Sequence, residues 1–561
     1  MGLSLTELLV EYLRSPLGLD EKAPRFSWQL SSDKKDTLQT AVEIRVREAK
    51  TEEEVWDSGL LSTDVSTGIT YEGKALKPCT AYVVQVEVTD NYGRKAVAET
   101  VFETGFLKKD KSVWEGADWI GAPDFHVAAN ARGVFVLEST FRMKEGSKRA
   151  GVVFGANDFR LLDHNQNEYG LEGENYIRYE INRAGETPVL DIYRVGYAKD
   201  DKKDVPFATV ELDKNVNFDE FHCLKIVVDG DKAFTYLDEK PVDAPETAMG
   251  PMKISGRVLN PRGHNDVLTY PRLNEIGFFA GEGDTAYFKD LTVKNLRTPG
   301  RTFVEETPEK VASIFAELPK EEGCFAVSGT QITKDPSRGA IPMLRSNIPV
   351  RKDAALQRAR LYVTARGIYD VHVNGARITE NLLAPGLTQY DRRMNYQAYD
   401  LTGILKPGNN GIGVALGSGW WCDAQTFVVK NYNYFGDKEA LLAKIVLEFA
   451  DGDREVYTTN PETWKYFGDG PYRYSGFFLG EQYDARKKAV YDAFSLADFD
   501  DSGWSTAAKE PWELPVIAEN RTFPAGFGRS WPQVHGGEVS FEGGYPAPVH
   551  VTAVRSAKKR L

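Results

Sequence analysis

The feature that most constrains this sequence is a succession of short runs in which apolar and polar residues alternate. Residues 41–46 (AVEIRV) and 82–88 (YVVQVEV) are two examples, and the second leads into the turn-forming residues 90–93 (DNYG). A period of two places alternate side chains on opposite faces of a β-strand, and the 3.6-residue period of an amphipathic helix is almost absent. The sequence therefore predicts an all-β protein made of tandem β-sandwich or jelly-roll modules.

Length and charge restrict the classes of protein further. A chain of 561 residues exceeds the size of a single hydrophobic core, so three or four domains are expected. The formal net charge of −13 argues against binding to nucleic acid or to an anionic membrane surface, because both need clustered Lys and Arg. No run approaches the roughly 18 apolar residues of a membrane span. The four cysteines are far apart and show no CxxC spacing, which argues against a disulfide framework or a zinc site.

Changes in composition along the chain predict five segments. Residues 1–111 are expected to form a fibronectin-III-like β-sandwich, and residues 112–300 a longer, Asn-rich jelly roll. Residues 301–340 are charged and contain prolines, so they are expected to be a linker with one short helix around residues 310–318. Residues 341–535 are expected to be a galactose-binding-like β-sandwich. Residues 536–561 are expected to be the start of a further domain that is cut off.

Several motifs occur in an order that resembles the amino-terminal domains of bacterial α-L-rhamnosidases, which are inverting glycoside hydrolases. The motifs are residues 24–28 (PRFSW), 117–121 (ADWIG), 387–393 (LTQYDRR), 417–421 (GSGWW) and 480–486 (GEQYDAR). The resemblance implies that these modules precede a catalytic (α/α)6 barrel, which would need about twelve long helices. No such region is expected in this chain, so no catalytic residue is assigned. Glu481 and Asp484 match the amino-terminal domain of the family, and we expect them to be solvated or structural.

Residues 112–300 have no counterpart at this point in most members of the family. They resemble an inserted, calcium-dependent L-rhamnose-binding carbohydrate-binding module, at residues 154–161, 174–179 and 260–261. Calcium takes six to eight oxygen ligands, and vicinal sugar hydroxyls can fill two of these positions. The residues that the resemblance assigns to a Ca²⁺ site are Asn157, Asp158 and Asn260. Those that it assigns to sugar binding are Asn175, Tyr176 and Arg178.

Structural explanations for the same residues stay open. Asn-Asp and Asn-Pro pairs are common turn formers for backbone reasons alone. Strand alternation also allows Tyr176 to be a core residue. Spacing by itself does not separate these explanations from a ligand site.

The function predicted is that of the carbohydrate-binding and scaffolding portion of an α-L-rhamnosidase that acts on terminal α-L-rhamnosides of plant or microbial glycans. The expected partner is an L-rhamnose-containing oligo- or polysaccharide. Two alternatives are that the chain is itself a glycoside hydrolase and that it is a structural, adhesion-like array of modules. We expect an extracytoplasmic location, periplasmic or secreted, while a cytoplasmic one stays open. The sequence does not determine the oligomeric state.

Overall fold

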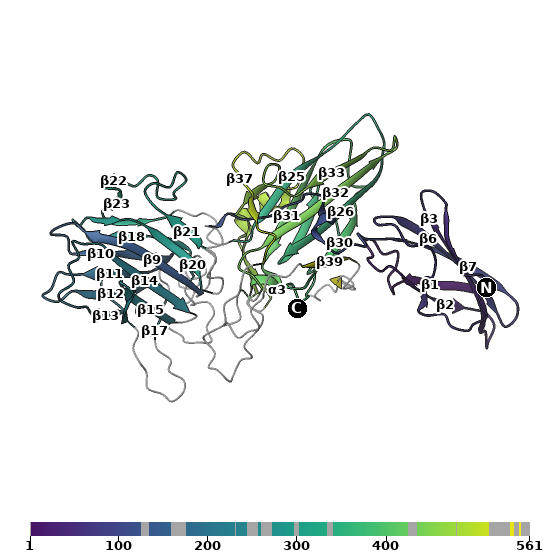
Figure 1. The fold of residues 1–561 in the computed structure, drawn as a ribbon, viewed down its shortest axis with the longest axis horizontal. Helices are drawn as coiled ribbons and strands as arrows, with labels where there is room; N and C mark the ends of the chain where they lie inside the picture. Colours follow the sequence, from purple (N-terminus) through teal and green to yellow (C-terminus); the bar gives the residue numbers. More distant parts are fainter. Residues whose placement is uncertain are drawn as a thin grey trace, which may run out of the picture.

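The computed structural model arranges the chain as three β-sandwich bodies that follow one another along the long axis of the molecule (Figure 1). It describes residues 2–124, 134–158, 175–229, 232–243, 256–259, 272–296, 302–333, 340–423, 433, 435–477, 480–514, 539–543 and 549–550. The longest helix within these ranges, α4 (Lys488–Ala493), has six residues. The prediction of an all-β protein is therefore confirmed. None of the described helices is long and apolar enough to cross a membrane.

The first body packs a three-stranded sheet against a four-stranded sheet. The three-stranded sheet has the order β1 (Ser4–Val10), β2 (Arg25–Ser31), β5 (Ile69–Thr70), and the four-stranded sheet β4 (Glu54–Asp57), β3 (Gln39–Glu48), β6 (Ala81–Asp90), β7 (Lys95–Glu103). Its core contains Val42, Ile44 and Val46 from β3, and Val84 and Val86 from β6. These are the apolar positions of the two alternating runs in the sequence, as a period of two requires.

The second body, at the left of Figure 1, is the jelly roll, with two large antiparallel sheets. The six-stranded sheet has the order β13 (Ala208–Glu211), β12 (Val189–Val195), β11 (Tyr176–Asn182), β10 (Arg149–Ala156), β18 (Glu275–Ala280), β24 (Thr330–Ile332). The facing sheet has the order β16 (Lys240–Asp243), β15 (Lys232–Leu237), β14 (His222–Asp229), β9 (Val134–Met143), β19 (Ala286–Phe288), β23 (Cys324–Val327), β22 (Lys320–Glu321). Strands β17 (Arg257–Val258), β20 (Leu291–Asn295) and β21 (Thr302–Glu306) pair with members of this second sheet.

Residues 301–340 differ from the expected linker. They supply β21 to β24 to the two sheets of the jelly roll, and Phe303, Phe315 and Phe325 are buried in its core. Residues 310–318 form turns and not the expected helix. The strands here have two to five residues and lie between prolines and charged residues, so their alternation is too short to be recognised locally.

The third body, in the centre of Figure 1, again has two sheets. The six-stranded sheet has the order β28 (Ala376–Arg377), β27 (Ile368–Val373), β31 (Gly408–Gly417), β25 (Met343–Val350), β34 (Lys465–Phe467), β37 (Ser505–Thr506). The other has the order β38 (Ala508–Glu510), β8 (Trp119–Gly121), β32 (Ala440–Phe449), β26 (Leu356–Arg366), β30 (Arg393–Asp400), β39 (Ser540–Gly543), and β33 (Arg454–Thr458) pairs with β32. Two short pairs lie outside these sheets, β29 (Asn381–Leu382) with β40 (Val549–His550) and β35 (Tyr472–Gly476) with β36 (Gly480–Tyr483).

Two strands of the third body come from segments that the sequence assigned elsewhere. Strand β8 lies in the range expected for the jelly roll, yet it pairs with β32 and β38. Strand β39 lies in the range expected for a further domain, yet it runs parallel to β30. The jelly-roll strands, β9 to β24, therefore stand in the chain between two strands of the third body, β8 and β25.

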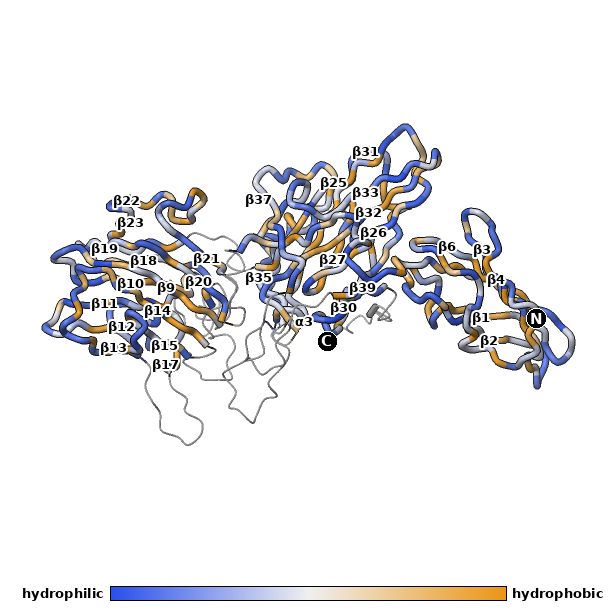
Figure 2. The backbone as a smooth tube through the Cα atoms, in the orientation of Figure 1, coloured by the Kyte–Doolittle hydropathy of each residue, from blue (hydrophilic) through white to orange (hydrophobic). Residues whose placement is uncertain are grey.

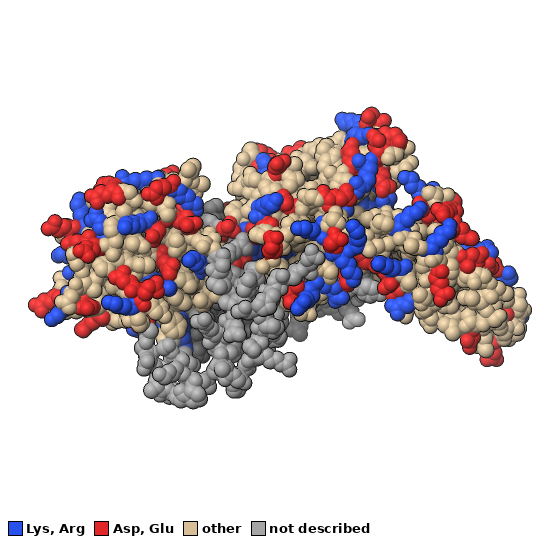
Figure 3. Space-filling model, in the orientation of Figure 1, with Lys and Arg blue, Asp and Glu red and all other residues tan. Residues whose placement is uncertain are grey.

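Hydrophobic residues recur along the strands of all three bodies (Figure 2), as expected for sandwiches with an apolar layer between their sheets. On the face shown in Figure 3, Lys and Arg are interspersed with Asp and Glu over each body.

Candidate functional site

A hollow of about 420 Å³ opens on the six-stranded sheet of the jelly roll. Its walls come from four neighbouring strands, β10, β11, β18 and β24, and from the residues just beyond their ends. The lining residues are Val153, Ala156, Asn157, Asn175, Tyr176, Arg178, Glu275, Thr330, Ile332 and Thr333.

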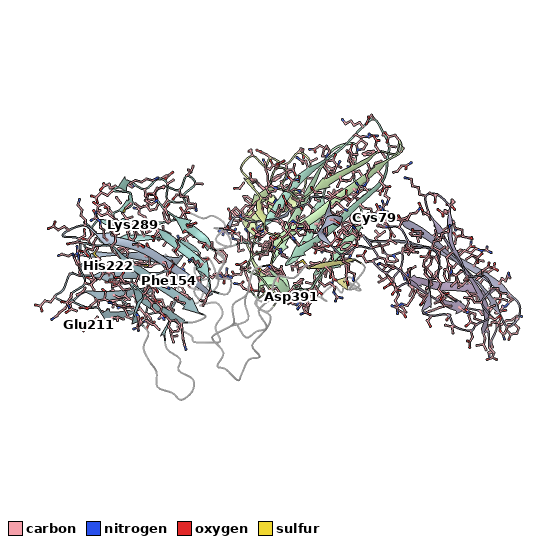
Figure 4. The ribbon with its side chains drawn as sticks, viewed as in Figure 1. Cys79, Phe154, Glu211, His222, Lys289 and Asp391 are labelled. Carbon is pink, nitrogen blue, oxygen red and sulfur yellow. The ribbon has the colours of Figure 1, made fainter. Side chains whose placement is uncertain are left out.

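The floor of the hollow belongs to the sheet face that points away from the main core. Phe154, labelled in Figure 4, points into the core from β10, so its neighbour Val153 faces the other side. Strand pairing places Arg178, Val153, Gly277 and Ile332 in one row across β11, β10, β18 and β24. A Cβ atom on Gly277 would lie 1.9 Å from the Gln331 carbonyl oxygen, so the glycine allows the backbone of β24 to approach closely at this point of the row.

Polar groups gather where the strands end. Asn157 has a left-handed backbone (φ 55°), and its amide N–H donates to the carbonyl of Asn175 at 3.0 Å. The Asn157 side-chain amide donates to the Glu275 carboxylate. Asn175 is fully buried and its Nδ2 donates to the Gly155 carbonyl at 2.9 Å, while its Oδ1 accepts no hydrogen bond from the described residues. A buried acceptor of this kind is costly unless a partner satisfies it, which makes Asn175 a candidate for contact with a ligand.

Arg178 is held in one position by its neighbours. Its Nε lies 2.7 Å from Oε2 of Glu180, and its guanidinium lies over the rings of Tyr193 (4.0 Å) and Phe279 (4.2 Å). Burial raises the pKa of Glu180, and the positive charges of Arg178 and Arg149 oppose that rise. Arg178 therefore contributes a fixed cation to the wall of the hollow.

Four of the six residues named from the sequence thus line one hollow, namely Asn157, Asn175, Tyr176 and Arg178. Asp158 is fully buried and does not line it. Asn260 lies outside the described residues.

Sequence reasoning missed the contributions of β18 and β24. Glu275 follows Asn157 by more than a hundred residues, and Thr330, Ile332 and Thr333 lie in the segment expected to be a linker. The only local signal for these last residues is the brief alternation at residues 330–332, which is too short to predict a strand with a functional face.

The atoms around the hollow that could ligate a metal ion are mostly oxygens of side-chain amides, hydroxyls and one carboxylate. Among the residues that the structure describes, no group of three or more His, Cys, Asp or Glu side chains is arranged as metal ligands. A cation at the hollow would therefore depend on amide oxygens of Asn157 and Asn175 together with the Glu275 carboxylate. Such a set suits a hard cation that prefers oxygen ligands.

The acidic pair that the sequence assigned to a non-catalytic role has ordinary surface partners. The Ser475 hydroxyl donates to Glu481 at 3.0 Å. The Asp484 carboxylate accepts from the backbone N–H of Arg486 at 3.0 Å, at the start of the short helix η4 (Ala485–Lys487). The hydrogen bond from the Arg486 side chain is the main cause that lowers the pKa of Asp484 to about 2. Both interactions are local structural ones.

The fold and the hollow define the chain as a multi-module β-sandwich protein with a small-ligand-sized hollow on one module. Two family models match it: "Rha78A-like, N-terminal immunoglobulin domain" over residues 5–108 and "Alpha-L-rhamnosidase N-terminal domain" over residues 354–525. The first module, expected to be fibronectin-III-like, thus matches a domain named for the immunoglobulin sandwich. Residues 5–108 and 354–525 are thus similar to amino-terminal domains of α-L-rhamnosidases.

Similar proteins agree with this relationship. An α-L-rhamnosidase of Streptomyces avermitilis is 28% identical over 529 residues, which are 92% of this chain and 46% of that protein. An α-L-rhamnosidase of an Alteromonas species is 32% identical over 181 residues, 32% of this chain and 19% of that protein. The crystal structure of the Streptomyces enzyme complexed with L-rhamnose shares the fold, with a TM-score of 0.51 and 23% identity over 91% of this chain and 45% of that one. The chain thus spans about half the length of the Streptomyces relative.

Proposed function

We propose that this chain is the carbohydrate-binding and scaffolding portion of an α-L-rhamnosidase, and that its jelly roll binds terminal α-L-rhamnosyl groups of plant or microbial glycans. The observation that carries the proposal is the convergence of Asn157, Asn175, Tyr176 and Arg178 on one hollow. The relationship to α-L-rhamnosidases supports rhamnose as the sugar. An extracytoplasmic location follows as part of the same proposal, because large glycans are met outside the cytoplasm.

The chemistry of the hollow suits a monosaccharide. Sugars present hydroxyl groups that donate and accept hydrogen bonds, and they also present apolar C–H surfaces. Asn175 Oδ1 would accept from a hydroxyl, and the Arg178 guanidinium would donate to a hydroxyl or ring oxygen. The half-buried ring of Tyr176 would cover a C–H face. Mixed walls with a few fixed polar groups are typical of small-ligand sites.

Calcium is part of the proposal. The residues that would hold it are Asn157, from the sequence assignment, and Glu275 and Asn175, whose side chains line the same hollow. The buried Asn175 Oδ1, which has no partner among the described residues, fits an oxygen-ligating cation as well as it fits a hydroxyl donor. When bound, Ca²⁺ would supply positive charge and coordination positions for vicinal hydroxyls. Asp158, which the sequence also assigned to the Ca²⁺ site, is fully buried and does not line the hollow.

A calorimetric titration with methyl α-L-rhamnoside, in Ca²⁺ and in a chelator, tests the proposal. We expect the chain to bind the glycoside in Ca²⁺ and to bind it more weakly in the chelator. Asn175→Ala should weaken binding by about tenfold, because one hydrogen bond to a buried group is worth roughly 1–1.5 kcal/mol. The matched control is Asn215→Ala in an exposed turn of the same module, which should bind like the unsubstituted chain. An absence of heat in both conditions would contradict the proposal and favour a structural array of modules.

The hydrolase alternative is tested on the same purified chain with p-nitrophenyl α-L-rhamnoside. We expect no release of p-nitrophenol above the uncatalysed rate. Inverting hydrolysis needs a carboxylic acid and a carboxylate about 6.5–9.5 Å apart on either side of the bond. Turnover that purifies with the chain would contradict the accessory role.

A further inference from the structure

We infer that the third body carries a carbohydrate-binding site of its own, in which one neutral pyranose ring packs against the side chain of Trp512. This site lies on a different body from the hollow of the jelly roll and goes beyond the proposed function. The inference comes from the residues that line a pocket on the outer face of the third body.

The pocket has a volume of about 280 Å³ and lies against the sheet that contains β8, β26, β30 and β39. Ile120 on β8 packs in the core between the two sheets of the third body, so its neighbour Trp119 faces outward. The remaining sides come from the short helix η1 (Lys111–Trp114), which follows the first body, and from the residues just after β38. The pocket is therefore built where several segments that are distant in sequence meet, which is a common place for a ligand site.

Trp512 supplies an aromatic surface to this pocket. Its side chain is half-buried, whereas Trp119 and Phe541, which contact it, are 1% and 2% exposed. Both contacts are edge-to-face, with ring centroids 6.2 Å and 6.1 Å from that of Trp512 and interplanar angles of 68° and 85°. Among the described residues, no aromatic ring lies parallel to Trp512. Its ring is thus held in place by buried neighbours, and its exposed part is available to a ligand.

Arg366, at the end of β26, adds a fixed cation. It is 5% exposed, and its Nη2 donates to the backbone carbonyl of Trp512 at 3.0 Å. Its guanidinium also lies over the ring of Trp119 at 4.7 Å. Because Arg366 holds the backbone of Trp512 and packs against Trp119, the cation and the aromatic surface keep one relative position. A guanidinium that is already ordered loses little entropy when it donates to a ligand.

Three exposed charged side chains, Asp110, Lys111 and Glu513, form the rim. Lys111 and Glu513 have no hydrogen-bond or ionic partner among the described residues. Hydrogen bonds from the side chain and the backbone N–H of Ser112 lower the pKa of Asp110, which keeps this carboxylate ionised as an acceptor. With Arg366, the pocket has two acidic and two basic groups. A ligand with a net charge of either sign would therefore meet two groups of its own sign.

This combination fits a neutral pyranose. Sugar hydroxyls both donate and accept hydrogen bonds, so they can use the acidic and the basic groups at once. The C–H face of the ring is apolar and can pack against the indole of Trp512. The volume lies at the lower end of the range for small-ligand pockets, which begins at about 300 Å³, so it suits a single ring.

Calorimetric titrations of the full chain with three neutral glycosides test the inference: methyl β-D-galactoside, methyl β-D-glucoside and methyl α-L-rhamnoside. The quantity of interest is the binding that Trp512→Ala removes, because Trp512 does not line the hollow of the jelly roll. We expect at least one glycoside to bind in this way and Trp512→Ala to weaken it by at least about tenfold, because the aromatic contact is lost. Trp512→Phe keeps an aromatic ring and should weaken it by only a few-fold.

Two matched controls separate the pocket from general effects on the third body. Trp504→Ala removes another half-buried tryptophan of this body, whose ring is stacked on Phe467 outside the pocket, and should leave binding unchanged. Glu513→Ala at the rim should weaken binding several-fold, because it removes an acceptor for a sugar hydroxyl. Glu462→Ala, an equally exposed position of the same body, should not.

The outcomes decide the inference and keep it apart from the proposed function. Binding of none of the three glycosides, or binding that Trp512→Ala and Glu513→Ala both leave unchanged, would overturn it. If Trp512→Ala does not fold by circular dichroism, Trp512→Phe and the exposed Glu513→Ala still decide. Rhamnoside binding that Asn175→Ala weakens and Trp512→Ala does not belongs to the hollow, so the failure of either site leaves the other measurable.

Discussion

At the scale of single residues, Asp20 connects the first body to two strands of the third body. Its Oδ1 accepts from the backbone N–H of Leu107 at 2.7 Å, and its Oδ2 accepts from the hydroxyl of Tyr396 at 2.9 Å and from the N–H of Gly543 at 2.7 Å. These partners belong to the end of the first body and to β30 and β39 of the third body. Burial raises the pKa of Asp20, while the three hydrogen bonds oppose the rise and the nearby Glu542 adds to it.

The raised pKa of Asp20 has a defined consequence for stability. Because the folded-state pKa lies above the ordinary value of 3.8, the contribution of Asp20 to stability is fully present below that value. It decreases as pH rises through the folded-state pKa. Asp20→Asn cannot titrate, so the stability of this variant relative to the unsubstituted chain should improve between about pH 4 and about pH 7.

Urea denaturation of both chains at the two pH values measures this difference. The matched control is Asp64→Asn, an exposed position of the same body. The control should show little change with pH. A difference between Asp20→Asn and the unsubstituted chain that stays constant with pH would contradict the prediction.

At the scale of elements, the segment with β21 to β24 decides whether the jelly roll is complete. Strand β23 pairs with β19, and β24 pairs with β18 beside the hollow. Phe325 on β23 is fully buried, and its ring lies 5.8 Å from that of Phe278 and 6.1 Å from that of Phe315. The segment is therefore part of the jelly-roll core, in spite of a composition that resembles a linker.

Removal of the Phe325 ring should destabilise the jelly roll. Phe325→Ala is expected to cost about 3–5 kcal/mol in the free energy of unfolding, because a fully buried aromatic side chain leaves a cavity. Val311→Ala in the same segment is the control, since Val311 is 100% exposed, and it should change stability by less than about 0.5 kcal/mol. Thermal and urea unfolding of the two variants measure both values. Equal stability of the two variants would show that the segment is only a connection.

At the scale of the whole molecule, the first and third bodies share a buried ionic contact. Glu103 at the end of β7 is 1% exposed and lies 2.5 Å from Nη2 of Arg358 and 2.9 Å from Nε of Arg360, both on β26. Arg358 also reaches Glu448, and Arg360 reaches Asp400. Paired and hydrogen-bonded charges of this kind fix the relative orientation of two modules, which is the scaffolding role that we propose.

Glu103→Gln would leave the two arginines without their shared carboxylate. A buried charge that loses its partner is strongly destabilising, so we expect a loss of about 3 kcal/mol at this junction and a larger radius of gyration in solution scattering. Glu99→Gln, an exposed position on the same strand, is the control and should be within about 0.5 kcal/mol of the unsubstituted chain. An unchanged stability and scattering curve for Glu103→Gln would mean that the junction is held by apolar packing alone.

Much of the fold can be predicted from local patterns. The alternation on β3 and β6 indicates the strands and the residues that face the core, because a strand has a period of two whatever it packs against. Part of the candidate site was also predictable, since Asn157, Asn175, Tyr176 and Arg178 lie within 22 residues of one another and the resemblance covers them.

The sequence by itself determined the class of fold and one side of the hollow, because both depend on contiguous residues. Only the tertiary structure decided that β8 and β39 complete the third body and that β24 closes the jelly roll beside Glu275. These pairings join residues that are up to several hundred positions apart. The backbone hydrogen-bonding groups at a strand edge are the same in every strand, so the local sequence does not specify which strand pairs there. The row of Arg178, Val153, Gly277 and Ile332 exists for the same reason, since strand register and not local sequence aligns these residues across four strands.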